Sequence, residues 1–231
     1  MRSVTAIILS RDPVSARFKS QIPKDLVPLN FISDIKSFQS YQRSWFMAIQ
    51  EVQTEWFFFL DHDDRLPADF SGVLDRLLAL VGSGALAYTN EVMINDAGIP
   101  TELKKGPYSQ EAHLKSPMLC HHLVLGRTEV AKQVIQNCPR GHFMPEMMVY
   151  FQMAKKGAVW LDETGYLWHR GQGGMSYWPS ALAAQVASIR WSTQNASNKP
   201  LAPLSLAEDL APVPEPAPLP IKKNNRKAKE S

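Results

Sequence analysis

The stretch WFFFLDHDDRLP, residues 56–67, joins an apolar run directly to a cluster of acidic residues. An uninterrupted apolar run of this kind is typical of a strand buried on both faces, as in a parallel sheet covered by helices. Asp61, Asp63 and Asp64 follow within four positions, where their negative charges repel one another. The sequence therefore predicts a central strand that ends in an acidic loop.

Strand-like and helix-like stretches alternate along the body of the chain. Strands are expected at residues 4–10, 26–33, 56–60, 85–94 and 121–127, and helices at 38–54, 67–80, 128–137 and from Pro145 to Gly157. The segment AVWLDETGYLWHR, residues 158–170, is expected to form a pair of strands. Strands that alternate with helices predict an α/β domain with a mostly parallel sheet flanked by helices.

Composition divides the chain into a domain, residues 1–198, and a Pro-rich, then basic tail, residues 199–231. The tail is expected to be extended or disordered, because proline blocks both helix and sheet, and it would be free to dock a partner. The tail holds six Lys/Arg and four Asp/Glu, so about +1 of the net charge of +3 remains for the body. A nearly neutral body argues against nucleic acid as a partner.

Neither a membrane span nor an oxidising compartment is indicated by the sequence. No apolar run approaches the roughly 20 residues that a spanning helix needs. The short apolar run near the N-terminus lacks a cleavage site and is interpreted as a first strand. Cys120 and Cys138 form neither a metal-type spacing nor a disulfide framework. A reducing cytoplasm is therefore the expected location.

The acidic loop is predicted to hold a divalent cation. Ligands of open α/β sheets bind at the carboxyl ends of the strands, where DHDD lies. Asp61 and Asp63 are two positions apart and point the same way if strand geometry persists. Carboxylate oxygens suit Mg²⁺ or Mn²⁺, with substrate phosphates in the remaining positions. The alternative is a solvated loop, in which Asp64 caps the helix that begins near Pro67.

Three segments together resemble family 2 glycosyltransferases, which have the GT-A (Rossmann-like) fold. They are FQSYQRSWFMAIQEVQTEWFFFLDHDDRLP, AYTNEVMINDAGIP and MPEMMVYFQMAKKGAVWLDETGYLWHRGQGGMS, at residues 38–67, 87–100 and 144–176. The resemblance covers most of residues 4–178 and is most specific at DHDD and in the order of the elements. It implies a transferase that uses a nucleotide-diphospho-sugar.

The resemblance also implies roles for the acidic residues. Asp63, with Asp61 or Asp64, would hold Mn²⁺ or Mg²⁺ together with the ribose or diphosphate of the nucleotide. His169 would be a further metal ligand. Glu146 would be the general base that deprotonates an acceptor hydroxyl.

Nucleotide contacts are implied for five further residues. Ser10 and Arg11 follow the first strand and would touch the nucleotide, and Asp34 after the second strand would bind its base. Arg43 would contact the base or a phosphate. Arg170 would neutralise the leaving diphosphate.

The predicted function is thus a metal-dependent glycosyltransferase that moves a sugar to a hydroxyl of a glycan, lipid or protein, with inversion by direct displacement. A metal-dependent nucleotidyl or phosphoryl transferase or hydrolase is the first alternative, with DHDD holding two ions. A non-catalytic nucleotide-sugar-binding module is the second. The second is favoured by a departure from the family, since Glu146 is followed by Met147 where the family has another carboxylate.

Two other motifs have simpler interpretations. His121 and His122 are adjacent in an expected strand, so their side chains would point to opposite faces and would not chelate one ion. A structural or surface role is therefore predicted for this pair. The segment GQGG, residues 171–174, would be either a lid over the diphosphate or a plain loop.

Overall fold

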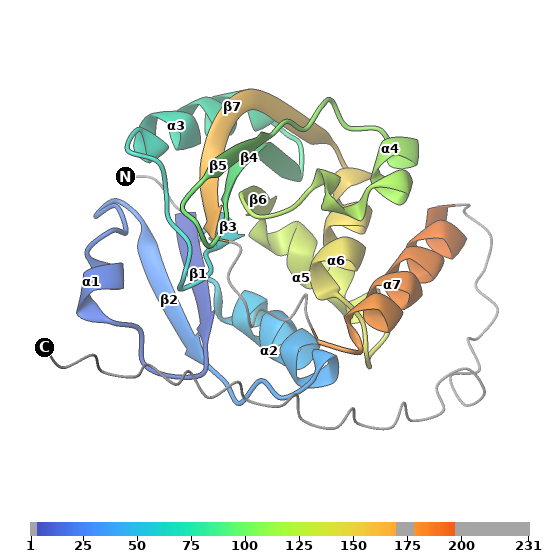
Figure 1. Ribbon diagram of the computed structural model, residues 1–231. Coiled ribbons are helices and arrows are strands. Elements are labelled where there is room, and N and C mark those ends of the chain that lie inside the picture. Colours follow the sequence, from blue (N-terminus) through green and yellow to red (C-terminus); the bar gives the residue numbers. More distant parts are fainter. Residues whose placement is uncertain (1–3, 170–177, 197–231) are drawn as a thin grey trace, which may run out of the picture. The chain divides into compact units, whose positions relative to one another are not determined.

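One mixed sheet with helices on both faces organises the chain (Figure 1). The computed structural model describes residues 4–169 and 178–196, so Arg170, the segment GQGG and the tail lie outside the described residues. The strands are β1 Val4–Ser10, β2 Val27–Ile32, β3 Trp56–Phe59, β4 Leu86–Ile94, β5 Pro100–Leu103, β6 Val124–Arg127 and β7 Ala158–His169. The helices are α1 Ala16–Lys19, α2 Phe38–Glu51, α3 Phe70–Val81, α4 Gln110–Lys115, α5 Thr128–Asn137, α6 Pro145–Ala154 and α7 Ala181–Ala196, with a 3₁₀ turn at Pro117–Leu119.

The strand order is β2-β1-β3-β6-β4-β5, and β7 pairs with β4. Strand β1 is parallel to β2 and β3, and β4 is parallel to β7. Strand β6 runs antiparallel to both β3 and β4, and β5 runs antiparallel to β4. The sheet is therefore mixed, with β1, β2, β3, β4 and β7 running in one direction and β5 and β6 in the other. The mostly parallel sheet expected from the sequence is present, and the two antiparallel strands were not predicted. A buried apolar run reads the same in either direction, so the pattern carries no information about strand direction.

Alternate residues of the central strands pack on opposite faces of the sheet. In β1, Ile7 and Leu9 belong to one core cluster, whereas Ala6 and Ile8 belong to the other. The first cluster is covered by α2, α5 and α6, and the second is covered mainly by α3 (Figure 1). The two-sided burial predicted from WFFFL is thus explained by helices on both faces.

The segment at residues 158–170 forms one strand and not the expected pair. Strand β7 pairs along the whole of β4, with register shifts on either side of Asn90. Asp162 lies at this irregularity, where its carboxylate accepts a hydrogen bond of 2.8 Å from the Asn90 amide. The polar residues DETG therefore occupy a bulge and not a hairpin turn.

Among the described residues, no helix combines the length and the apolar character needed to cross a membrane.

Candidate active site

The acid loop, defined here as residues 61–65, begins where β3 ends. Strand β3 is parallel to β1, and the Leu60 N–H donates to the Ile7 carbonyl at 2.9 Å. The loop therefore opens at the carboxyl edge of two adjacent parallel strands, where α/β sheets bind ligands.

Strand β7 also holds the acid loop in place through hydrogen bonds. The N–H groups of Arg65 and Leu167 each donate to the other residue's carbonyl at 3.0 Å. The Asp61 N–H donates to the Tyr166 hydroxyl at 3.0 Å, and the His169 N–H donates to Oδ1 of Asp64 at 2.7 Å. The sheet itself therefore sets the positions of the two carboxylates.

The surroundings of Asp61 and Asp64 disfavour the charged form of both carboxyl groups. Asp64 is only 2% exposed, and its Oδ2 has no hydrogen-bond partner among the described residues. Burial raises the pKa of Asp64 to about 8, and the charge of Asp61 adds to the effect. Although Asp61 is accessible to solvent, desolvation by the surrounding protein and then the charge of Asp63 raise its pKa to about 6. A divalent cation would remove both penalties, so the donor set fits Mn²⁺ or Mg²⁺.

His122 completes a group of three possible ligands with these carboxylates. One ligand atom each from Asp61, Asp64 and His122 all lie within 4.8 Å of one another. The His122 ring stacks on Tyr166 with ring centroids 5.0 Å apart and an interplanar angle of 14°. The sequence signal that marked this residue was the pair His121-His122.

The expected placement of His121 and His122 in a strand, with their side chains on opposite faces, is wrong. Strand β6 begins only at Val124, and His122 has a left-handed backbone with φ of 57°. The two side chains therefore turn toward each other, with their Nδ1 atoms 2.9 Å apart, and the His122 side chain is only 4% exposed.

Asp63 and His169 lie outside this three-residue group. Asp63 is exposed. His169 contributes its backbone N–H to Asp64, while its ring Nδ1 is buried without a hydrogen-bond partner in the described part of the chain. Asp63 thus faces solvent, and His169 acts on the site here through its main chain.

Glu146 lies in the first turn of α6, directly after Pro145. Burial, with the negative charge of Asp61, raises the pKa of Glu146 to about 7, although hydrogen bonds from its own backbone and from Tyr41 lower it. Oε2 of Glu146 is buried and unpartnered among the described residues. A carboxyl group with a pKa near neutrality is suited to accept a proton at physiological pH.

Tyr41 on α2 was missed from the sequence, where it appears as one apolar position of an amphipathic helix. Burial raises its pKa well above the usual value, and the charges of Glu146 and Asp61 add to this. Tyr41 therefore lies close enough to Glu146 and Asp61 for their charges to raise the pKa of its hydroxyl group.

Ser10 and Arg11 lie at the same edge of the sheet as the acid loop. Ser10 ends β1, and its buried Oγ has no hydrogen-bond partner among the described residues. Arg11 is exposed, with its guanidinium carbon 5.9 Å from the ring centroid of Trp178. Asp34 is exposed and forms an ion pair of 2.5 Å with Lys36.

Arg43 lies on a different face of α2 from Tyr41. It is two positions from Tyr41, which turns it by about 200° around the helix axis. It is exposed and lines a surface groove of about 340 Å³ between α2 and the segment after α5. Phe46 and Arg140 line the same groove, and the Arg140 guanidinium lies over the Phe46 ring.

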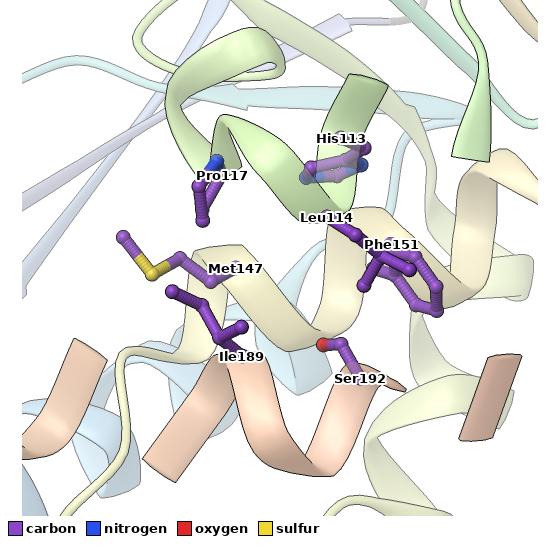
Figure 2. A pocket seen from close by; sticks show the side chains of 7 residues that line it. All are labelled: His113, Leu114, Pro117, Met147, Phe151, Ile189 and Ser192. Atoms are coloured by element: carbon purple, nitrogen blue, oxygen red, sulfur yellow. The ribbon is translucent and has the colours of Figure 1, made fainter. Parts of the chain in front are cut away.

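A second, much smaller pocket lies between α4, α6 and α7 (Figure 2). Its volume of about 10 Å³ has room for about one water molecule, so it is no sugar site. The side chains that line it are those of His113, Leu114, Pro117, Met147, Phe151, Ile189 and Ser192.

The fold is similar to solved glycosyltransferase structures, and the α/β fold of GT-A type predicted from the sequence is confirmed. TarS 1-349 from S. aureus in complex with UDP-GlcNAc matches with a TM-score of 0.61 and 13% identity, over 87% of this chain and 68% of that one. The complex of the same protein with UDP matches with a TM-score of 0.51 and 12% identity, over 84% and 66%.

A further structure of TarS 1-349 matches with a TM-score of 0.52 and 12% identity, over 73% of this chain. The match spans 60% of the length of that TarS structure. No protein-family model and no curated protein sequence match the chain. At these identities the likeness to TarS establishes the fold alone.

Proposed function

We propose that this protein is a metal-dependent glycosyltransferase that moves a sugar from a nucleotide-diphospho-sugar to an acceptor hydroxyl with inversion. The observation that carries the proposal is the combination of Asp61 and Asp64, whose pKa values are raised by burial, with Glu146, whose pKa is about 7. The first two supply a cation site at the edge of the sheet, and the third supplies a base. The similarity to TarS solved with UDP-GlcNAc supports UDP-sugars as the first donors to test.

Asp61 and Asp64 would hold Mn²⁺ or Mg²⁺. The ion would neutralise the diphosphate as the leaving group departs. Asp63, exposed at the outer side of the acid loop, would contact the ribose or diphosphate. Ser10 and Arg11 would contact the nucleotide at the end of β1.

Glu146 would act on the acceptor. Its carboxylate would take the proton of the acceptor hydroxyl while the hydroxyl oxygen bonds to the anomeric carbon. The bond from that carbon to the diphosphate oxygen would break in the same step, and the electron pair would leave with the diphosphate. Tyr41 would orient Glu146 by its hydrogen bond.

A binding module without catalysis is the second candidate. Met147 is buried where the family resemblance expects another carboxylate, so Glu146 would act without an acidic neighbour in the chain. Such a module would bind the nucleotide and release no sugar. As for location, the buried free thiols of Cys120 and Cys138 suit a reducing compartment, and we propose the cytoplasm.

Calorimetric titration of UDP, GDP and CDP, with and without Mn²⁺, tests the site. We expect one nucleotide to bind in a Mn²⁺-dependent manner and at least tenfold more weakly to D61N and D64N. The control is D96N, which removes an exposed carboxylate from the turn after β4. Equal binding by D61N and wild type would contradict the proposal.

Turnover separates the candidate functions. A transferase releases free nucleoside diphosphate from the sugar donor, and E146Q should slow this release at least a hundredfold without weakening nucleotide binding. A binding module shows no release from wild type. A phosphoryl transferase or hydrolase cleaves the nucleotide and leaves the sugar–phosphate bond intact.

A further inference from the structure

A buried polar chain leads from Lys105 through Glu91 to His122. The Lys105 ammonium lies 3.0 Å from Oε1 of Glu91, and Oε2 of Glu91 lies 2.5 Å from Nδ1 of His122. Lys105 also donates to the Met118 carbonyl at 2.7 Å. The side chain of Glu91 is only 2% exposed, so both of its carboxylate oxygens are paired within the protein.

The Lys105–Glu91–His122 pairing contributes little net stability, because desolvating a buried ion pair costs about as much as the pairing returns. The left-handed backbone of His122 adds a conformational cost for a residue other than glycine. The backbone cost falls on His122, whose ring groups with Asp61 and Asp64, and the polar pairing cost falls on Glu91, which contacts that ring. They indicate that the protein holds the His122 ring in position for a ligand.

The geometry of His122 leaves one ring nitrogen available. Nδ1 of His122 lies 2.5 Å from a carboxylate oxygen of Glu91, and in the tautomer that donates to this oxygen Nε2 keeps its lone pair. The face of the ring is held by Tyr166, whose hydroxyl also accepts the Asp61 N–H. A carboxylate that fixes the tautomer and orientation of a histidine is the usual support of a metal-binding imidazole.

Asp61 and Asp64 provide the other two possible metal ligands beside His122. A ring nitrogen of His122 lies within 4.8 Å of carboxylate oxygens of both Asp61 and Asp64. Oδ2 of Asp64 is buried in this group without a hydrogen-bond partner in the described part of the chain. Glu91 and His121 form a second such group with His122, but Glu91 is already neutralised there by Lys105.

We propose that His122 binds the metal ion together with Asp61 and Asp64, and that Glu91 positions its ring. The inference rests on the proposed function only for the location of the metal. Two carboxylates and one imidazole make a mixed oxygen and nitrogen site. Such a site favours Mn²⁺ over Mg²⁺, because imidazole suits transition metals and Mg²⁺ prefers oxygen and water.

Pulsed electron paramagnetic resonance of the full chain loaded with Mn²⁺ tests the proposal. We expect a ¹⁴N coupling from a directly bound imidazole in the wild type, absent in H122N. We also expect the coupling to persist in H121N, H62N and H169N, which change the neighbouring histidines. In calorimetry with MnCl₂ alone, H122N should bind at least tenfold more weakly, and the exposed-site control H142N should bind as wild type does.

Several results would overturn the proposal. They are absence of Mn²⁺ binding, absence of nitrogen coupling in Mn²⁺-loaded wild type, coupling retained in H122N, or coupling lost in H121N, H62N or H169N. If H122N does not fold, persistence of the coupling in the three other histidine variants still assigns the nitrogen to His122.

Glu91 has its own test. E91Q keeps the shape of the side chain but changes the acceptor that fixes Nδ1, so Mn²⁺ affinity should fall three- to tenfold while the nitrogen coupling remains. Unchanged affinity in folded E91Q would contradict the positioning role. Failure of this inference can be distinguished from failure of the proposed function, because Mn²⁺ coordination is measured without nucleotide or sugar donor. A protein that shows the coupling but transfers no sugar keeps this inference and loses the proposed function.

Discussion

The hydroxyl group of Tyr166 accepts a hydrogen bond of 3.0 Å from the backbone N–H of Asp61, although the two residues are 105 positions apart. The aromatic ring of the same tyrosine stacks on His122. One side chain of β7 therefore positions both the acid loop and the imidazole beside it.

Replacing Tyr166 by phenylalanine keeps the stacking and removes the acceptor. We expect the free energy of unfolding of Y166F to fall by about 1–3 kcal/mol, because the Asp61 N–H and the Asp64 side chain both lose their hydrogen bond with the hydroxyl group. Urea unfolding at pH 7 measures this change. Mn²⁺ affinity should fall as well, since Asp61 is less well held. A variant as stable as wild type would show that the bond contributes nothing.

The proposed reaction should depend on pH through Glu146. As the base must be ionised, donor turnover should rise as the pH passes about 7 and then level off. In Y41F the hydrogen bond that lowers the Glu146 pKa is lost, so the rise should move to higher pH while the plateau rate changes less. Initial rates from pH 5.5 to 9 on both proteins test this. A rise that moves to lower pH in Y41F would contradict the assignment.

His113 should make folding stability sensitive to acid. Its ring is 2% exposed, between Tyr108 and Phe151, and burial lowers its pKa to about 4. The unfolded chain, with a histidine pKa of about 6.5, binds the proton first, so stability is lost as the pH falls from about 6.5 toward 4. At about 1.4 kcal/mol for each pKa unit, the loss is at most about 3.5 kcal/mol.

The variant H113L isolates this contribution. Compared with wild type, its stability should fall less between pH 7 and pH 4.5, as measured by urea unfolding at each pH. The exposed-site variant H142L should behave like wild type. If H113L and wild type lose stability in parallel, His113 does not carry the effect.

Replacing Arg43 is predicted to leave the binding of UDP and Mn²⁺ unchanged. It lies on the face of α2 away from Tyr41, in the groove with Arg140. We expect R43A to bind UDP and Mn²⁺ within twofold of wild type, whereas R11A, at the end of β1, should weaken UDP binding severalfold. Calorimetry on both variants decides the matter. A loss of UDP binding in R43A would support the role that the family resemblance implies.

Much of the fold was predictable because burial imposes a period on the sequence. Strand β1 was predicted with the bounds that the structure has, and so was α5 at residues 128–137. Their apolar residues follow the two- and 3.6-residue repeats of the elements that they form. Strand direction and the continuous β7 were not predictable, since neither depends on local pattern.

The proposed site was visible in the sequence only in part, for a different reason. Asp61 and Asp64, the carboxylates of the proposed site, stand out because they follow an apolar strand. Tyr41 and Tyr166 look like ordinary core aromatics in the sequence, and their polar atoms gain meaning only when distant segments meet. His122 was misinterpreted because one left-handed residue placed the pair outside the strand.

The attachment of the acid loop to β7 also limits how this protein can change length. The Arg65–Leu167 bridge and the contacts of Asp61 and Asp64 with β7 must all be satisfied by one short connection. A single inserted or deleted residue at 62–64 would break at least one of them. The exposed turn from Asn95 to Gly98 is held by hydrogen bonds within itself and with Ile99. Insertions, whether natural or engineered, should therefore be tolerated at that turn and not at the acid loop.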